Sequence, residues 1–171
     1  MYSLWLMPNE VASKTYQDII YKLSKPLAAP IFEPHITLLS GMDTPILDQT
    51  FYELSVLAAL TKPFNVSFSN IAYENDFYRS LYMKAHPVDK LIQLQKETKD
   101  IFKTVDYPFR PHLSLLYAEL AQKCKPKLAK QLNTKLLKKA QFSSIRLMQT
   151  KGKVEDWKLV EEFPFWLSEI K

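Results

Sequence analysis

Residues 33–39 read Glu33-Pro34-His35-Ile36-Thr37-Leu38-Leu39, and residues 110–116 read Arg110-Pro111-His112-Leu113-Ser114-Leu115-Leu116. Both segments share the order proline, histidine, aliphatic residue, hydroxyl residue, leucine, leucine. The chain has 171 residues and three histidines, and two of the three lie in these segments, one in each half. Histidine is the side chain best suited to proton transfer near neutral pH. The repeat therefore indicates a symmetric acid–base site.

Each repeated segment is predicted to be a β-strand that starts at or near its histidine. Proline is tolerated at the first position of a strand, and on a strand residues i and i+2 point to the same side. His35 and Thr37 should therefore share one face, and His112 and Ser114 should do so in the second half. Two imidazoles and two hydroxyls would then line one cleft.

This set of groups suits in-line displacement at the phosphorus atom of a cyclic phosphodiester. One imidazole takes a proton from the attacking water and the other protonates the leaving ribose oxygen, each role being worth about 10²–10⁴-fold in rate. The hydroxyls of Thr37 and Ser114 can donate to the phosphate oxygens on which negative charge grows. A single histidine-x-hydroxyl strand is more often structural than functional, but a structural role does not explain two copies.

Composition narrows the class of protein and of ligand. Hydrophobic residues make up 47% of the chain, which indicates a globular domain. No apolar run approaches the roughly 20 residues of a membrane span, and no signal peptide is evident, so we expect a cytoplasmic protein that does not contact a membrane. The net charge of +5 favours anionic ligands.

The scarcity of two residue types excludes several kinds of site. Gly41 and Gly152 are the only glycines, which excludes the glycine-rich phosphate loops of the Walker and dinucleotide-binding types. Side chains must then bind any phosphate. The single Cys124 excludes a cysteine-based metal site, and no metal-ligand spacing is conspicuous. We expect neither a metal nor another cofactor.

Hydrophobic periodicity predicts an α+β fold. Strands are expected at residues 2–7, 35–40, 64–69, 77–85, 112–117, 141–150 and 156–165. Helices are expected after Asn9 as N-cap, after Thr44 and Pro45, at residues 88–102, and around Leu128, Leu132 and Leu136. Turns are expected at Gly41 and around Gly152, and His86 is interpreted as a surface cap residue.

This order of elements places one histidine strand at a comparable point in each half. We therefore expect a single bilobal domain over residues 1–171, in which two pseudo-symmetric lobes present antiparallel sheets to a central cleft. The helices should lie outside the sheets.

The two segments resemble the paired HxTx signatures of the two-histidine (2H) phosphoesterase superfamily. The stretch from Pro111 to Leu120 looks like the cyclic phosphodiesterase branch known from plants and yeast, and the strand at residues 2–5 and the late Trp157 are also similar to that branch. The resemblance implies a bilobal fold and metal-independent hydrolysis. The implied substrates are ADP-ribose 1″,2″-cyclic phosphate, which gives the 1″-phosphate, and nucleoside 2′,3′-cyclic phosphates, which give 2′-phosphates.

The resemblance also implies a role for each motif residue. His35 and His112 become the acid–base pair, and Thr37 and Ser114 become phosphate ligands. By analogy His112 activates the water and His35 protonates the leaving oxygen. Tyr117 matches a tyrosine that helps to hold the phosphate.

Some neighbouring residues have two open interpretations. Strict alternation directs Tyr117 away from the cleft, so it reaches the substrate only if its strand bends or ends near residue 116. Phe77 and Tyr78 suit either a base-stacking surface or the core. Arg79 or Arg110 suits a second phosphate, although a solvated surface arginine is the commoner outcome.

A lysine-rich stretch supports an alternative function, an RNA-end processing 2′,3′-cyclic phosphodiesterase or an RNA ligase-like 2H protein that acts on oligonucleotides. Its members are Lys123, Lys125, Lys127, Lys130, Lys135, Lys138 and Lys139. We favour the solvated face of a helix, because no aromatic residues interleave the lysines. The expected partner is thus a small-molecule cyclic phosphate, with nucleic acid as the weaker alternative, and the expected state is a monomer. A catalytically silent nucleotide-binding module is disfavoured by the intact histidine and hydroxyl pairs.

Overall fold

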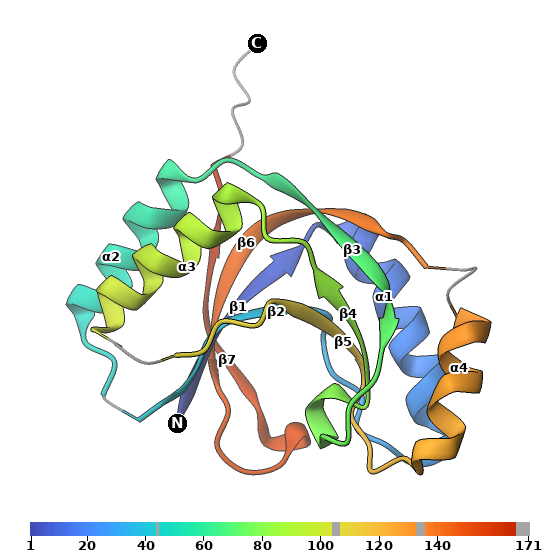
Figure 1. Ribbon diagram of the computed structural model, residues 1–171. Helices are drawn as coiled ribbons and strands as arrows, with labels where there is room; N and C mark the ends of the chain where they lie inside the picture. Colours follow the sequence, from blue (N-terminus) through green and yellow to red (C-terminus); the bar gives the residue numbers. More distant parts are fainter. Residues whose placement is uncertain (44, 104–106, 133–135, 167–171) are drawn as a thin grey trace.

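The computed structural model describes residues 1–43, 45–103, 107–132 and 136–166, and these residues form seven strands and four α-helices (Figure 1). The strands are β1 (Tyr2–Pro8), β2 (Ile36–Met42), β3 (Phe64–Ala72), β4 (Leu81–Ala85), β5 (His112–Leu116), β6 (Lys139–Gln149) and β7 (Lys158–Pro164). The helices are α1 (Glu10–Ser24), α2 (Asp48–Leu60), α3 (Asp89–Phe102) and α4 (Lys125–Leu132). The predicted α+β class is confirmed.

The strands form one antiparallel sheet that closes on itself. Their order is β1-β2-β5-β4-β3-β6-β7, and β1 also pairs with β6. The two histidine strands β2 and β5 are therefore neighbours, joined where Ile36 pairs with Leu113. On the other side, residues 64–67 of β3 pair with residues 139–142 of β6. Our expectation of two sheets, one in each lobe, was wrong, because all seven strands join one sheet. The bilobal pseudo-symmetry stays a prediction.

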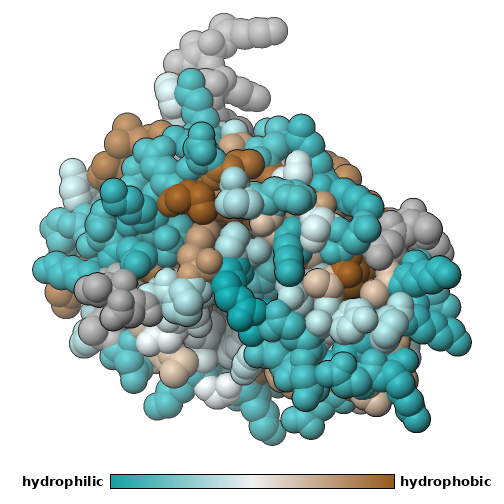
Figure 2. Space-filling model, in the orientation of Figure 1, coloured by the Kyte–Doolittle hydropathy of each residue, from teal (hydrophilic) through white to brown (hydrophobic). Residues whose placement is uncertain are grey.

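Helices cover the sheet from two sides, as expected. In Figure 1, α2 and α3 lie next to each other on one side, and α1 and α4 lie on the other. On the face shown in Figure 2, hydrophilic side chains predominate and hydrophobic ones are confined to limited patches. No helix among the described residues is both long enough and apolar enough to cross a membrane.

The aliphatic residues between the polar positions of β2 and β5 belong to the core. Ile36, Leu38, Leu113 and Leu115 have no exposed surface. Burial of one such side chain contributes about 1.5–3 kcal/mol. The opposite face of each strand then carries its histidine and hydroxyl residue.

The predicted N-cap of helix α1 is confirmed. The side chain of Asn9 accepts a hydrogen bond from the backbone N–H of Ala12, which satisfies one of the free donors of the first turn. Tyr16 and Ile20 are fully buried on the inner face of the helix.

Helix α2 begins later than predicted. We expected Thr44 as the cap and Pro45 as the first helical residue, but residues 45–47 are not helical and the helix starts at Asp48. The carboxylate of Asp48 lies in the first turn, where it interacts favourably with the helix dipole. Thr44 itself lies outside the described residues.

A bulge replaces the predicted turn at Gly41. Tyr2 pairs with Met42 whereas Ser3 pairs with Ser40, so Gly41 is an extra residue and β2 continues through it. The backbone φ of Gly41 is 76°, a left-handed conformation that glycine adopts without steric cost.

The strand predicted over residues 77–85 starts only at Leu81, because a short 3₁₀ turn precedes it. The carboxylate of Asp76 accepts hydrogen bonds from the backbone N–H groups of Tyr78 and Arg79, at 2.9 and 3.1 Å. A side-chain cap of this kind offers the backbone an alternative to the strand ladder.

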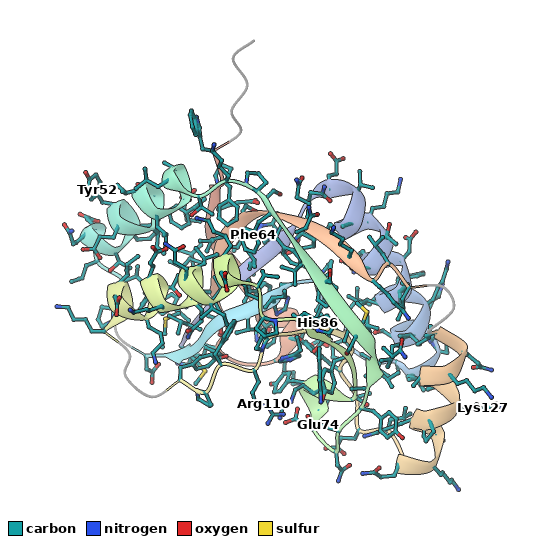
Figure 3. All side chains as sticks on the ribbon, turned by 45° about the horizontal axis from the view of Figure 1, so that its top comes forward. Tyr52, Phe64, Glu74, His86, Arg110 and Lys127 are labelled. Atoms are coloured by element: carbon teal, nitrogen blue, oxygen red, sulfur yellow. The ribbon has the colours of Figure 1, made fainter. Side chains whose placement is uncertain are left out.

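Two smaller predictions also need correction. His86 is exposed, as expected, but Val88 is the N-cap of α3, so His86 caps nothing (Figure 3). The described part of helix α4 runs to Leu132, and Leu136, which we expected on the same helix, is not helical. Residues 133–135, which include Lys135, lie outside the described part of the chain.

Candidate active site

The two histidine strands meet at a cavity of about 340 Å³. Among the residues predicted for the site, His35, Thr37, His112 and Tyr117 line this cavity. An antiparallel register that passes through the Ile36–Leu113 pair directs each histidine toward the hydroxyl residue of the other strand. The structure therefore brings four of the five predicted residues together, whereas Ser114 is not among the lining residues of the cavity.

The two imidazoles are held in the same way. The Nδ1 atom of His35 lies 2.6 Å from the carbonyl oxygen of Glu33, and that of His112 lies 2.7 Å from the carbonyl oxygen of Arg110. A carbonyl oxygen can only accept, so each Nδ1 carries the hydrogen. Each Nε2 is then left to take or give a proton. In both copies the accepting residue stands two positions before the histidine.

The residues that supply these carbonyls are themselves anchored, with opposite charges in the two halves. The carboxylate of Glu33 pairs with Arg146 of β6 at 2.6 Å. The guanidinium of Arg110 pairs with Glu74 at 2.8 Å. Each ion pair ties the segment before a histidine strand to a distant part of the chain, and so limits movement of the carbonyl.

His35 is buried against aromatic rings. Its imidazole stacks on the indole of Trp5 with 3.7 Å between ring centroids, and the ring of Phe32 approaches it edge-on. Only 6% of the His35 surface is exposed. Burial lowers the pKa of His35 to about 3, opposed by the Glu33 carbonyl and assisted by the charge of His112. His35 is therefore neutral at neutral pH.

His112 is the more accessible histidine. Its side chain is half-buried, and the ring of Tyr82 meets it edge-on at 5.4 Å. Burial lowers the pKa of His112, the hydrogen bond to Arg110 opposes this, and the positive charge of Arg79 lowers it further. The two histidines thus have different environments despite identical hydrogen bonds.

The two hydroxyl residues also differ. Thr37 lines the cavity, and its side chain has no hydrogen bond to any other described residue. Ser114 is buried, and its hydroxyl donates to the carbonyl of Tyr78 at 2.7 Å. Thr37 is therefore free to donate to a ligand, whereas Ser114 can do so only by giving up the Tyr78 carbonyl.

Tyr117 reaches the cavity because β5 ends one residue before it, at Leu116. Its ring stacks on Phe32 with 3.6 Å between centroids and meets Tyr78 edge-on. Burial, and then the proximity of Tyr78, raise the pKa of Tyr117, so the phenol keeps its proton and can donate it in a hydrogen bond.

Several cavity residues were not predicted from the sequence. Trp5 is one of them, although the i, i+2 alternation of β1 would have placed it on the same face as Ser3, which also lines the cavity. Ser3 hydrogen bonds to the hydroxyls of Ser40 and Thr150 at 3.0 and 2.9 Å. This hydroxyl cluster joins segments 147 residues apart, so no local pattern could have revealed it.

Of the two aromatic candidates and the two arginine candidates, only one of each lines the cavity. Tyr78 lines the cavity and stacks on Trp157 at 6.1 Å, whereas Phe77 packs beside Tyr78 outside the cavity lining. Arg79 lines the cavity, whereas Arg110 does not. Among the described residues, no group of three or more histidine, cysteine, aspartate and glutamate side chains is arranged to hold a metal ion.

A family model described as cyclic phosphodiesterase-like protein matches residues 1–165 of the chain. The chain is 25% identical over 124 residues to a cyclic phosphodiesterase of Arabidopsis thaliana, and the match covers 71% of this chain and 67% of the relative. It is 30% identical over 108 residues to a 2′,3′-cyclic-nucleotide 3′-phosphodiesterase of Yarrowia lipolytica, with 58% of this chain and 50% of the relative covered.

Solved structures show the same fold at lower identity. TT0787 of Thermus thermophilus has a TM-score of 0.64 and 16% identity, and the match covers 96% of this chain and 97% of that chain. LigT of E. coli, solved in complex with 3′-AMP, has a TM-score of 0.59 and 16% identity, with 96% of each chain covered. At these identities the similarity concerns the fold alone.

Proposed function

This chain belongs to the cyclic phosphodiesterase-like protein family, and from that premise we propose that it hydrolyses cyclic phosphodiesters without a metal ion. The proposed substrates are ADP-ribose 1″,2″-cyclic phosphate, converted to the 1″-phosphate, and nucleoside 2′,3′-cyclic phosphates, converted to 2′-phosphates. The observation that best supports this proposed function is the arrangement of the two histidines. His35 and His112 line one cavity, and each has its Nδ1 committed to a carbonyl and its Nε2 available.

In the proposed reaction, water attacks phosphorus in line with the leaving ribose oxygen. One imidazole accepts a proton from the water through Nε2 as the new P–O bond forms. The other imidazole donates a proton to the ribose oxygen as the old P–O bond breaks. The hydroxyl of Thr37 and the phenol of Tyr117 donate to the non-bridging oxygens, and Ser114 joins them if its hydroxyl turns away from Tyr78.

The different burial of the two histidines suggests which is the base. His35 is neutral in the free protein, because burial lowers its pKa to about 3. A neutral imidazole is ready to accept a proton from water. Burial lowers the pKa of His112 as well, but its side chain is more exposed than that of His35, and the negative charge of a bound phosphate favours its protonated form. We therefore propose His35 as base and His112 as acid, the reverse of the roles that the family resemblance implies.

The function is tested by incubating the protein with adenosine 2′,3′-cyclic phosphate or ADP-ribose 1″,2″-cyclic phosphate in EDTA. We expect the 2′-phosphate and the 1″-phosphate as products. His35→Gln and His112→Gln should each lower kcat by at least about 10²-fold. His86→Gln is the matched control, since His86 is exposed and lies outside the cavity. Absence of turnover with both substrates, or activity that EDTA abolishes, would contradict the proposal.

The same variants test the assignment of base and acid. If His35 is the base, His35→Gln should remove the fall of kcat/KM on the acid side of the pH profile. If His112 is the acid, His112→Gln should remove the fall on the alkaline side. The opposite pattern would restore the roles implied by the resemblance.

The lysine-rich stretch provides little support for the oligonucleotide alternative. Lys125 is buried, and its ammonium group donates to the carbonyl of Glu74 at 2.5 Å. Lys123, Lys127 and Lys130 are exposed around α4, but none of them lines the cavity. These exposed lysines fit the solvated face of a helix.

A further inference from the structure

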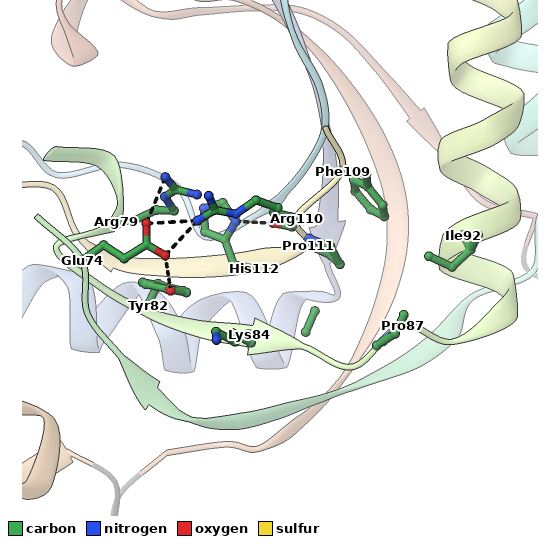
Figure 4. Close-up of a pocket in the computed structure, with 11 residues that line it drawn as sticks. Glu74, Arg79, Tyr82, Lys84, Pro87, Ile92, Phe109, Arg110, Pro111 and His112 are labelled. Atoms are coloured by element: carbon green, nitrogen blue, oxygen red, sulfur yellow. Dashed lines mark hydrogen bonds and ion pairs between the residues drawn. The ribbon is translucent and has the colours of Figure 1, made fainter. Parts of the chain in front are cut away.

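A second cavity has a volume of about 490 Å³, and Figure 4 shows the residues that line it. Arg79 and His112 line both cavities, so the two spaces share a wall at the proposed acid. A molecule that places its cyclic phosphate beside His112 can therefore continue into the second cavity. The proposed reaction makes no use of this space.

The second cavity combines cationic and apolar surfaces. Arg79, Lys84 and Arg110 bring three positive charges to it, and Glu74 brings one negative charge. A second carboxylate, that of Asp76, pairs with Arg79 at 3.3 Å, which leaves one net positive charge. Ile92 and Phe109 are among its apolar lining residues. A net positive cavity with an apolar part suits a phosphoryl group that is attached to a sugar or a base.

Glu74 is fully engaged with the cavity wall and stays ionised. Its carboxylate accepts hydrogen bonds from Tyr82 at 2.6 Å and from Arg110 at 2.8 Å, and it pairs with Arg79 at 3.0 Å. The hydrogen bond from Tyr82 is the main cause that lowers the pKa of Glu74. The negative charge is thus already balanced within the protein, and it fixes the guanidinium group of Arg79 at the boundary between the cavities and that of Arg110 in the second cavity.

Lys84 provides a cation that no carboxylate of the described residues neutralises. Its backbone pairs with that of His112, so the two side chains stand on the same face of neighbouring strands. Its ammonium group lies at the cavity without an ion pair to the other residues drawn in Figure 4. An unpaired cation beside the proposed acid can bind a second anionic group of the substrate.

We propose that the second cavity binds a phosphoryl group on the C5 oxygen of the same ribose that carries the cyclic phosphate. This inference rests on the proposed function and narrows its substrate class. ADP-ribose 1″,2″-cyclic phosphate and an oligonucleotide that ends in a 2′,3′-cyclic phosphate both have such a group, whereas a plain nucleoside 2′,3′-cyclic phosphate has none. Lys84 and Arg110 contact the phosphoryl group, and Phe109 and Ile92 contact the nucleoside beyond it.

A pair of substrates that differ only in this group tests the proposal. We expect kcat/KM to be about tenfold higher for adenosine 5′-phosphate 2′,3′-cyclic phosphate than for adenosine 2′,3′-cyclic phosphate, which corresponds to one extra ionic contact. Lys84→Ala should remove most of this preference, which is measured as the ratio of the two kcat/KM values within each protein. Lys127→Ala, on the exposed side of α4, is the matched control and should change neither rate. Equal kcat/KM for the two substrates in the wild-type protein would overturn the subsite.

A binding measurement separates failure of the subsite from failure of the proposed function. Adenosine 2′,5′-bisphosphate and adenosine 2′-phosphate, the corresponding products, are titrated calorimetrically into the wild-type protein and Lys84→Ala. We expect about tenfold tighter binding of the bisphosphate, and loss of that difference in the variant. If neither cyclic phosphate is hydrolysed but this difference is present, the proposed function is wrong and the subsite stands. Equal affinity for the two products overturns the subsite in every case.

Two longer substrates then identify the source of the phosphoryl group. ADP-ribose 1″,2″-cyclic phosphate and a diribonucleotide with a 2′,3′-cyclic phosphate end are compared with the plain nucleoside. If either substrate has a higher kcat/KM than the plain nucleoside, and Lys84→Ala removes that difference, the result supports the subsite and identifies the molecule that occupies it. Rates no higher than that of the plain nucleoside for both would contradict it.

Discussion

The imidazole of His35 lies flat on the indole of Trp5, with 3.7 Å between the ring centroids and 4° between the ring planes. The indole excludes water from one whole face of the imidazole. Water stabilises the protonated form of an imidazole better than an indole does. The contact with Trp5 therefore contributes to the low pKa of His35. The relationship joins β1 to the start of β2 and underlies the first two predictions.

Replacement of Trp5 by leucine should raise the pKa of His35 from about 3 toward the ordinary value of about 6.5, because water then reaches the ring. NMR titration of the His35 Hε1 resonance measures the change. Trp166→Leu is a suitable control, since that indole is 57% exposed and lies outside the cavity lining. An unchanged His35 pKa in Trp5→Leu would show that the stack does not cause the shift.

The low pKa of His35 should make the protein less stable as the pH falls. In the folded state His35 stays neutral to about pH 3, whereas in the unfolded chain it binds a proton near pH 6.5. The unfolded state therefore binds more protons between these values, and stability declines by up to about 1.4 kcal/mol per pH unit as the pH drops through them.

Urea unfolding of the wild-type protein and His35→Gln at pH 7, 6, 5 and 4 tests this dependence. Carboxylates titrate in both proteins, so the difference between the two curves isolates His35. The free energy of unfolding of the wild type should fall more steeply than that of the variant. Parallel curves would refute a buried neutral His35.

Thr37→Val and Ser114→Ala should differ in their effects. Thr37 has no side-chain hydrogen bond among the described residues, so Thr37→Val should lower kcat by roughly 10²-fold and leave stability unchanged. Ser114 donates to the carbonyl of Tyr78, so Ser114→Ala should also lower the free energy of unfolding by about 1 kcal/mol. Steady-state kinetics and urea unfolding of both variants measure these effects, and equal stability losses would contradict the distinction.

Glu33→Gln should affect catalysis more than stability. The ion pair with Arg146 holds the segment whose carbonyl orients His35, but Glu33 is half exposed, so its loss should cost less than about 1 kcal/mol of stability. We expect kcat to fall by about three- to tenfold with little change in KM, since orientation acts on the chemical step. Glu161→Gln, an exposed position on β7, is the control. Unchanged kcat in Glu33→Gln would remove the anchoring role.

Leu113→Ala should be strongly destabilising. Leu113 is fully buried and pairs with Ile36 where the two histidine strands meet, so truncation should cost about 2–5 kcal/mol. Leu159→Ala, at a position on β7 that is 50% exposed, should change stability by less than about 0.5 kcal/mol. Denaturant unfolding provides both values, and similar values for the two variants would contradict the placement of Leu113 in the core.

Local sequence patterns predicted helices and strands correctly where one residue type strongly favoured one kind of element. Asn9 caps α1 as expected, and the alternation at Val66 and Phe68 corresponds to a real strand. The predictions failed where a side chain offered the backbone another partner. Asp76 caps a short turn and delays β4, although the residues that follow it have the composition of a strand.

The candidate site, too, divides into features that follow from the local sequence and features that depend on tertiary contacts. The sequence by itself determined that His35 shares a face with Thr37, and His112 with Ser114, because the direction of side chains on a strand depends only on the local backbone period. Only the tertiary structure decided that β2 lies beside β5, that Trp5 covers His35, and that the hydroxyl of Ser114 is engaged with Tyr78. The physical reason is that burial and hydrogen bonding depend on partners brought together by folding, and no pattern of neighbours along the chain encodes those contacts directly.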